Sequence, residues 1–212
     1  MNYIQMSNGP WLTFLVLSPL AGMLLVALAG ALRLDDRLVK IGATAWSLTS
    51  LGLALFLWAG FNANAVADGQ SVIQFVEKIP WIDAIKVDYF LGVDGISLPL
   101  VLLTVVMAPI AMLASFSVES RVKMHYALLF LLEAAMLGYF VALNFFFFAI
   151  FWEFNWCRRS LSSRTGGATP KTRRYAAFKF FVYLLFRISQ HVLLLFQFFY
   201  VATARIGILH ST

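Results

Sequence analysis

Two carboxylates interrupt the most apolar segment of the chain, and they are the side chains best suited to chemistry. Glu133 and Glu153 lie within YALLFLLEAAMLGYFVALNFFFFAIFWEF, which runs from Tyr126 to Phe154. An ionisable side chain at the centre of a membrane helix costs about 2.5 to 3.5 kcal/mol, so such residues are rare and mark functional sites. Because a carboxyl group shielded from water can exchange a proton near neutral pH, we predict that the two acids form a proton relay. The alternative is that each is a structural acid held by a hydroxyl group or a basic partner.

The positions of the two acids predict that they lie at matched depth on neighbouring helices. A break at Asn144 would let residues 126–143 form one helix and the residues from Phe145 onward form a second helix that runs back. At about 1.5 Å of rise per residue, Glu133 then lies roughly 15 Å from the turn and Glu153 roughly 13 Å. Both depths fall near the midplane of a hydrocarbon core about 30 Å thick.

The composition indicates an integral membrane protein. Only 12% of the 212 residues are charged and 61% are hydrophobic, against about 25% charged residues in soluble proteins. The formal charge of +6 comes from basic residues in short loops between apolar runs, which argues against a nucleic-acid partner. The single cysteine, Cys157, excludes an internal disulfide and every multi-cysteine metal or iron–sulfur pattern. The N-terminus lacks the basic region of a signal peptide, so we expect the first apolar run to be a retained helix.

The apolar runs predict an all-α fold, a polytopic bundle of about six transmembrane helices in a single membrane domain over residues 1–212. The expected spans are residues 11–32, 41–61, 98–118, 126–143, 145–157 and 175–204. The fifth span is short and disrupted, because it provides only about 18 Å of helix before Arg158 and Arg159. Residues 62–96 are expected to form one long external loop, in which SVIQFVEKIPW predicts a β-hairpin, and residues 158–174 a basic cytoplasmic connector. Ser97 is predicted as the N-cap of the third span.

The distribution of basic residues predicts the orientation. In chain order the connectors hold three, two, two, none and six Lys or Arg residues, and the N-terminal tail holds none. The two lysines of the long loop are outnumbered by acids. Because short basic loops remain cytoplasmic, we expect both termini to lie outside.

Three motifs occur in order along the chain: YFLGVDGISLPLVLLT, FLLEAAMLGYFVALNFFFFAIFWEF and RRYAAFKFFVY. Together they resemble subunit M of proton-pumping NADH-quinone oxidoreductase, an antiporter-type subunit of the complex I membrane arm. The resemblance implies a multi-pass protein of the bacterial plasma membrane that couples quinone reduction elsewhere in the complex to proton translocation. It assigns that translocation to three residues. Glu133 matches an acid of the family's fourth helix, Glu153 a glutamate of its fifth helix and Lys179 a lysine of its sixth.

The same resemblance implies that this chain is a subunit of an oxidoreductase with no redox or catalytic centre of its own. NADH, FMN, iron–sulfur clusters and quinone are expected in other subunits, so no cofactor-binding or metal-binding residue is predicted here. The implied partners are the other membrane-arm subunits and the lipid bilayer. The family also uses a lysine in a seventh helix, which has no counterpart here, so we expect this polypeptide to be an incomplete N-terminal portion.

The stretches 155–165, 186–191 and 205–212 depart from the family pattern. We interpret them as local disruption of the reading frame followed by early termination, either in nature or as sequencing errors. Two other interpretations of the whole chain stay open: a subunit of a multi-subunit cation/proton antiporter, and a non-functional structural membrane fragment. His125 and His210, at a loop edge and in the tail, are expected to be solvated.

Overall fold

The structure is a computed structural model, and it describes most of the chain up to residue 152. The described residues are 4–6, 9–62, 64, 66–67, 70–71, 73–82, 87–152, 186, 190, 193–194 and 197. The chain divides into two compact units, Met1–Arg158 and Arg159–Thr212. In the second unit only five isolated helical residues are described. The expected connector 158–174 and most of the expected span 175–204 therefore lie outside the described residues.

Four helices of the first unit are long and apolar enough to cross a membrane. They are α1 (Trp11–Ala31), α2 (Asp36–Gly60), α3 (Ser97–Ala114) and α4 (Val122–Val141). A 3₁₀ turn, η2 (Ser115–Ser117), extends α3, and residues 145–152 are again helical. The prediction of a polytopic helical bundle is confirmed for this part of the chain.

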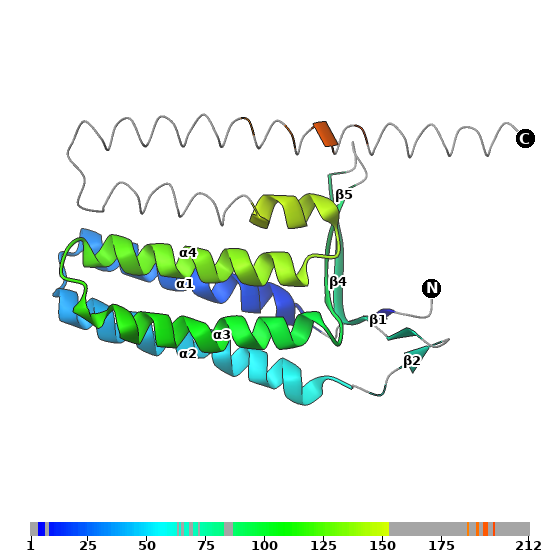
Figure 1. The fold of residues 1–212 in the computed structure, drawn as a ribbon, viewed down its shortest axis with the longest axis horizontal. Helices are drawn as coiled ribbons and strands as arrows, with labels where there is room; N and C mark the ends of the chain where they lie inside the picture. Colours follow the sequence, from blue (N-terminus) through cyan, green and yellow to red (C-terminus); the bar gives the residue numbers. More distant parts are fainter. Residues whose placement is uncertain are drawn as a thin grey trace, which may run out of the picture. The chain divides into compact units, whose positions relative to one another are not determined.

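The four helices pack side by side as a closed set (Figure 1). Helix α1 contacts α2 and α4, and α3 contacts the same two helices from the other side. Two apolar clusters fill the interior: one around Leu12, Leu57 and Leu137, the other around Tyr126 and Phe130. Leucines on the outer faces of the helices are more than 40% exposed, among them Leu24, Leu48 and Leu103. Such outward apolar faces suit a lipid surrounding, in which the hydrophobic residues need no further cover.

A β-hairpin stands across one end of the helices (Figure 1). Strand β4 (Ile73–Ile82) pairs antiparallel with β5 (Val87–Val93), with Ile79 opposite Tyr89. Strand β1 (Ile4–Met6) adds parallel to β4, and β2 (Val66–Ala67) pairs separately with β3 (Gln70–Ser71). A hairpin is present, but SVIQFVEKIPW does not form it alone: the segment supplies the single strand β4, and the partner strand β5 follows it in the sequence. The long loop therefore carries a folded sheet.

The hairpin is fixed to the bundle by a buried carboxylate, that of Glu77 on β4. Glu77 is 7% exposed, and its Oε1 accepts a hydrogen bond of 2.6 Å from the backbone N–H of Leu12. The backbone N–H and the hydroxyl of Thr13 also donate to this carboxylate. The Thr13 hydroxyl lies 2.8 Å from the Tyr89 hydroxyl, and burial of Tyr89 together with the charge of Glu77 raises the pKa of Tyr89 despite that hydrogen bond. An acid thus satisfies the free N–H groups at the N-terminus of α1, where the helix dipole favours negative charge.

The start of α3 corrects the prediction that Ser97 is the N-cap. The Asp94 side chain accepts hydrogen bonds from the backbone N–H groups of Ile96 and Ser97, at 3.0 and 2.7 Å. The Ser97 hydroxyl in turn accepts from the Asp94 N–H at 2.9 Å. This reciprocal pair is a capping box with the acid in the capping position, and the prediction failed because serine and aspartate are equally good caps.

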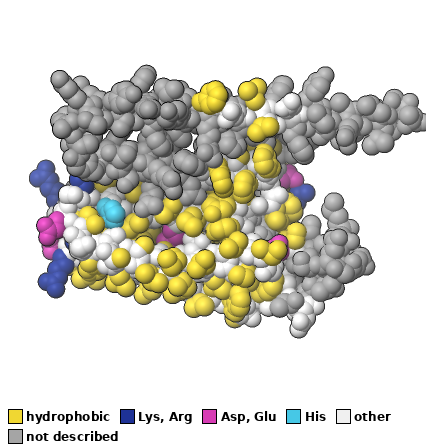
Figure 2. Space-filling model, in the orientation of Figure 1, with side chains coloured by type: hydrophobic (Ala, Val, Ile, Leu, Met, Phe, Trp, Pro, Cys, Tyr) yellow, Lys and Arg dark blue, Asp and Glu magenta, His cyan; other side chains and the backbone are white. Residues whose placement is uncertain are grey.

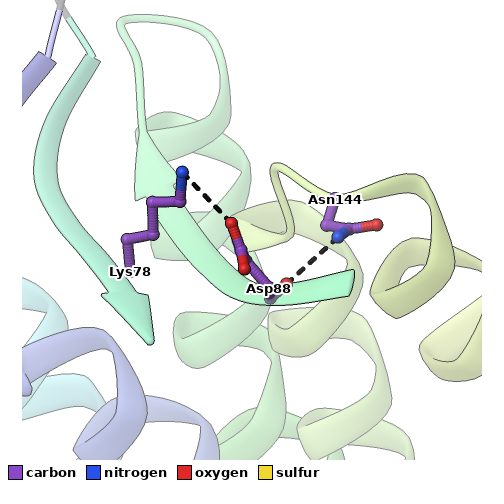
Figure 3. A network of polar contacts seen from close by, with 3 residues as sticks. All are labelled: Lys78, Asp88 and Asn144. Atoms are coloured by element: carbon purple, nitrogen blue, oxygen red, sulfur yellow. Dashed lines mark hydrogen bonds and ion pairs between the residues drawn. The ribbon is translucent and has the colours of Figure 1, made fainter. Parts of the chain in front are cut away.

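Asn144 lies at the break between α4 and the helix at 145–152. Its Oδ1 accepts a hydrogen bond from the Phe146 N–H at 2.9 Å, which caps the new helix. Its Nδ2 donates to the Asp88 backbone oxygen at 3.0 Å, and Asp88 also pairs with Lys78 at 3.1 Å (Figure 3). The Leu143 N–H donates to the Phe90 carbonyl beside this network. The turn that reverses the chain is therefore attached to β5.

The opposite end of the bundle carries the basic connectors. Lys40 Nζ donates to the Phe116 carbonyl at 2.8 Å, and Lys123 pairs with Asp36 at 3.7 Å. His125 lies within α4, half-buried, with Nε2 2.9 Å from the Ser115 hydroxyl. The expectation that His125 is solvated at a loop edge is wrong, because α4 begins three residues before it and turns its ring toward η2.

Candidate functional site: a buried acid between three helices

Glu133 lies in the middle of α4, inside the bundle. Its side chain is 3% exposed. The Ser50 hydroxyl of α2 lies 2.5 Å from Glu133 Oε1 and 2.9 Å from the Ser47 carbonyl oxygen of its own helix. A serine hydroxyl has one proton and two acceptor positions. It can therefore donate to an ionised Glu133, or accept from a protonated Glu133 while donating to the Ser47 carbonyl.

The arrangement thus suits a carboxyl group that changes protonation state. A buried polar atom left without a partner costs free energy, about 1 to 3 kcal/mol for a neutral group and more for a charged one. Because Ser50 can serve either form, Oε1 keeps a hydrogen bond whether the proton is present or absent. Neither form requires α2 and α4 to move apart.

The second carboxylate oxygen, Oε2, is buried and has no hydrogen-bond partner among the described residues. Glu133 also lines a cavity of about 290 Å³ between α3 and α4. The other walls are mostly apolar: Leu103, Met107, Met112, Met136 and Phe140 are among them. Thr104 adds one hydroxyl, which donates to the Leu100 carbonyl at 2.8 Å. The cavity is large enough for several water molecules, each of which occupies about 30 Å³ in the liquid. Among the described residues that line it, Glu133 is the only ionisable one.

The other two residues predicted for proton translocation, Glu153 and Lys179, lie outside the described residues. The helix that leads toward Glu153 is described through Trp152, and it packs on α4 through Tyr139 and Phe148. Among the described residues no group of three or more His, Cys, Asp or Glu side chains could hold a metal ion. Of the stretches that depart from the family pattern, only Phe186 and Gln190 are described.

Sequence reasoning missed Ser50 as the partner of Glu133. The segment around it, SLTSLG, holds three hydroxyl residues in an apolar run, which is a usable signal for a polar helix face. It does not say which hydroxyl meets which acid, because Ser50 and Glu133 are far apart along the chain. Ser50 is 2% exposed, whereas Thr49 is exposed and its hydroxyl donates to the Trp46 carbonyl of its own helix.

Comparison with known proteins gives the same family as the motifs. The family model described as NADH-ubiquinone oxidoreductase chain 4, amino terminus, matches residues 44–157, more than half of the chain. This region contains α3, α4, Ser50, Glu133 and the hairpin.

Relatives match over most of this chain. F(420)H(2) dehydrogenase subunit M of Methanosarcina mazei is 35% identical over 76% of the chain and 32% of its own length. NADH-quinone oxidoreductase subunit M of Rhodobacter capsulatus is 37% identical over 81% of the chain and 32% of its own length. NAD(P)H-quinone oxidoreductase chain 4 2 of Microcystis aeruginosa is 34% identical over 84% of the chain and 31% of its own length. The chain spans about a third of the length of these curated relatives. Because the family model covers more than half of the chain and these relatives are at least 34% identical over most of it, the chain belongs to the NADH-ubiquinone oxidoreductase chain 4 family, whose amino-terminal part it contains.

Proposed function

We propose that this chain is part of a membrane-arm subunit of a proton-pumping, quinone-reducing oxidoreductase, and that Glu133 carries protons within it. The single observation that supports the role of Glu133 is its placement as a carboxyl group buried between three helices. One of its oxygens lies on Ser50, and the other lies beside a cavity and has no partner in the described part of the chain. An acid in this position is a functional site by default in a membrane protein.

The names of the relatives support the assignment to such a complex. They are subunits of F(420)H(2) dehydrogenase, NADH-quinone oxidoreductase and NAD(P)H-quinone oxidoreductase, so each belongs to an assembly of several subunits. The reductants in these names differ while the subunits resemble this chain to a similar degree. We infer that the reductant, FMN, the iron–sulfur clusters and the quinone are bound by partner subunits, and that this chain contributes to ion movement.

Two further residues complete the proposed path. Glu153 would receive or supply the proton of Glu133 from the neighbouring helix, and Lys179 would set the charge near them, because a nearby cation favours the ionised form of a carboxyl group. The basic connectors at the α1–α2 and α3–α4 turns would face the cytoplasm of a bacterial cell, with both termini outside.

The test replaces Glu133 by Gln in the assembled complex that contains this chain. We expect quinone reduction to continue while proton translocation, followed by a pH-gradient dye in proteoliposomes, falls severalfold, because the amide cannot release a proton. Ser50→Ala should lower translocation less, since Glu133 remains. Glu119→Gln, an exposed acid of the α3–α4 turn, is the matched control. Unchanged proton translocation per quinone reduced in Glu133→Gln would remove the role proposed for Glu133.

A further inference from the structure

A second cavity lies on the other side of the bundle, between α1 and α2. Its volume is about 210 Å³, and its walls are apolar. Small residues from both helices, among them Gly22, Ala29 and Gly42, make room for it, and Trp46 closes one side. The Trp46 indole N–H donates to the Ser18 carbonyl at 2.8 Å, which fixes the ring in place. The groove is therefore a stable feature of the α1–α2 pair.

The groove reaches the basic turn that joins the two helices. Leu34 and Leu38 line it, and each directly follows an exposed arginine, Arg33 and Arg37. Figure 2 shows Lys and Arg side chains at this end of the bundle, interspersed with acidic side chains and beyond the apolar surface of the helices. An apolar groove that opens beside two guanidinium groups matches the two parts of an anionic phospholipid, its acyl chain and its phosphate.

The two arginines are also available for a ligand. In the described part of the chain, neither takes part in an ion pair, whereas Lys123 is paired with Asp36 and Lys40 is bonded to the Phe116 carbonyl. The acids of the turn are Asp35 and Asp36, and Asp36 is the one engaged by Lys123. A guanidinium group binds phosphate with two parallel hydrogen bonds. The charge of the two arginines also favours a headgroup with a net negative charge over a zwitterionic one, in which the choline offsets the charge of the phosphate.

We propose that the α1–α2 groove is a binding site for a diacyl anionic phospholipid. One acyl chain lies in the groove, and the phosphate contacts Arg33 and Arg37. Basic pockets between transmembrane helices on the cytoplasmic side commonly take such headgroups. The proposal is independent of the role of Glu133, which does not line this groove and lines the α3–α4 cavity instead.

The experiment measures lipid binding to the detergent-solubilised full chain by native mass spectrometry, with phosphatidylglycerol and phosphatidylcholine as probes. Gly42→Phe introduces a ring at a residue that lines the groove, and a Cβ atom at Gly42 would meet nothing within 4 Å, so the first atom of the new side chain causes no clash. Gly52→Phe is the matched control, since Gly52 lies on the same helix, is equally open and does not line the groove. Arg33→Gln and Arg37→Gln test the headgroup contact.

We expect Gly42→Phe to weaken phosphatidylglycerol binding about tenfold, which corresponds to about two displaced methylene groups. Each arginine substitution should weaken it about fivefold and leave phosphatidylcholine binding unchanged. Equal binding of the two lipids by the unmodified chain would overturn the proposal. So would equal effects of Gly42→Phe and Gly52→Phe, which would place the lipid elsewhere. Gly42→Leu and the arginine variants keep the test valid if Gly42→Phe fails to fold.

Discussion

The attachment of the hairpin to α1 through Glu77 leads to a quantitative prediction. The Glu77 carboxylate accepts hydrogen bonds from the Leu12 and Thr13 N–H groups and from the Thr13 hydroxyl. Hydrogen bonds to a charged group contribute about 1.5 to 3 kcal/mol, and an anion at a helix N-terminus adds about 0.3 to 1 kcal/mol. Water can solvate part of the exposed helix end once the carboxylate is gone, so we expect Glu77→Ala to lower the free energy of local opening by about 2 kcal/mol.

Hydrogen exchange measures that free energy directly. A loss of about 2 kcal/mol corresponds to exchange about 30-fold faster for the amides of Leu12 and Thr13. The assay is exchange followed by mass spectrometry on the chain in nanodiscs, read on peptides that cover the first turn of α1. Peptides from the middle of α2 should be unaffected, because the hydrogen bonds of Glu77 to described residues go to Leu12 and Thr13 of α1.

Two variants control this experiment. Glu77→Gln keeps an acceptor oxygen but loses the charge, and neutral hydrogen bonds are about half as strong, so its exchange should be intermediate. Glu119→Ala removes an exposed acid of a turn and should leave the first turn of α1 unchanged. If Glu77→Ala accelerates exchange at Leu12 and Thr13 by less than about threefold, the carboxylate does not hold the helix end and our account of the hairpin attachment is wrong.

Two further predictions concern helix packing and pH. A methyl group at Gly22 would lie 2.6 Å from Trp46 and 2.7 Å from Phe130, so Gly22→Ala should lower the free energy of unfolding of the bundle by about 1 to 3 kcal/mol. Gly42→Ala should raise it by up to about 1 kcal/mol, because a methyl group there meets nothing. Denaturant unfolding in detergent measures both changes, and equal effects of the two substitutions would contradict the packing. Partial burial acts to raise the pKa of Asp94, but the N–H groups of Ser97 and Ile96 outweigh it and hold that pKa below the ordinary 3.8. The capping box is therefore fully formed above pH 3.8 and is lost as the pH falls through the lower pKa of the folded state. Amide exchange at the start of α3, corrected for its intrinsic pH dependence, should become faster only in that lower pH range. Asp94→Asn should abolish this pH dependence.

The sequence by itself determined the class of this protein and the identity of the central acid. Apolar runs of about 20 residues are long enough to cross the hydrocarbon core of a bilayer, so α1 to α4 were predictable from hydropathy alone. An acid within such a run is conspicuous because of its insertion cost, which is why Glu133 was found without a structure. The extended structure of SVIQFVEKIPW in the long loop was also predictable, since alternation of apolar and polar residues is a local pattern, but its pairing with β5 was not predicted.

The tertiary structure alone decided what surrounds each acid. Ser50 and Glu133 meet because α2 and α4 pack together, and nothing in the local sequence of either helix specifies that rotation. Glu77 looked like one of several acids in an exposed loop, yet the fold turns it inward to the start of α1. Asp94, not Ser97, caps α3, because backbone geometry chose between two residues of equal capping strength. The hydrophobicity of a segment follows from its own residues, so it can be predicted from the sequence. A hydrogen bond between side chains of different segments forms only when packing brings the donor and the acceptor together, so it depends on the tertiary structure.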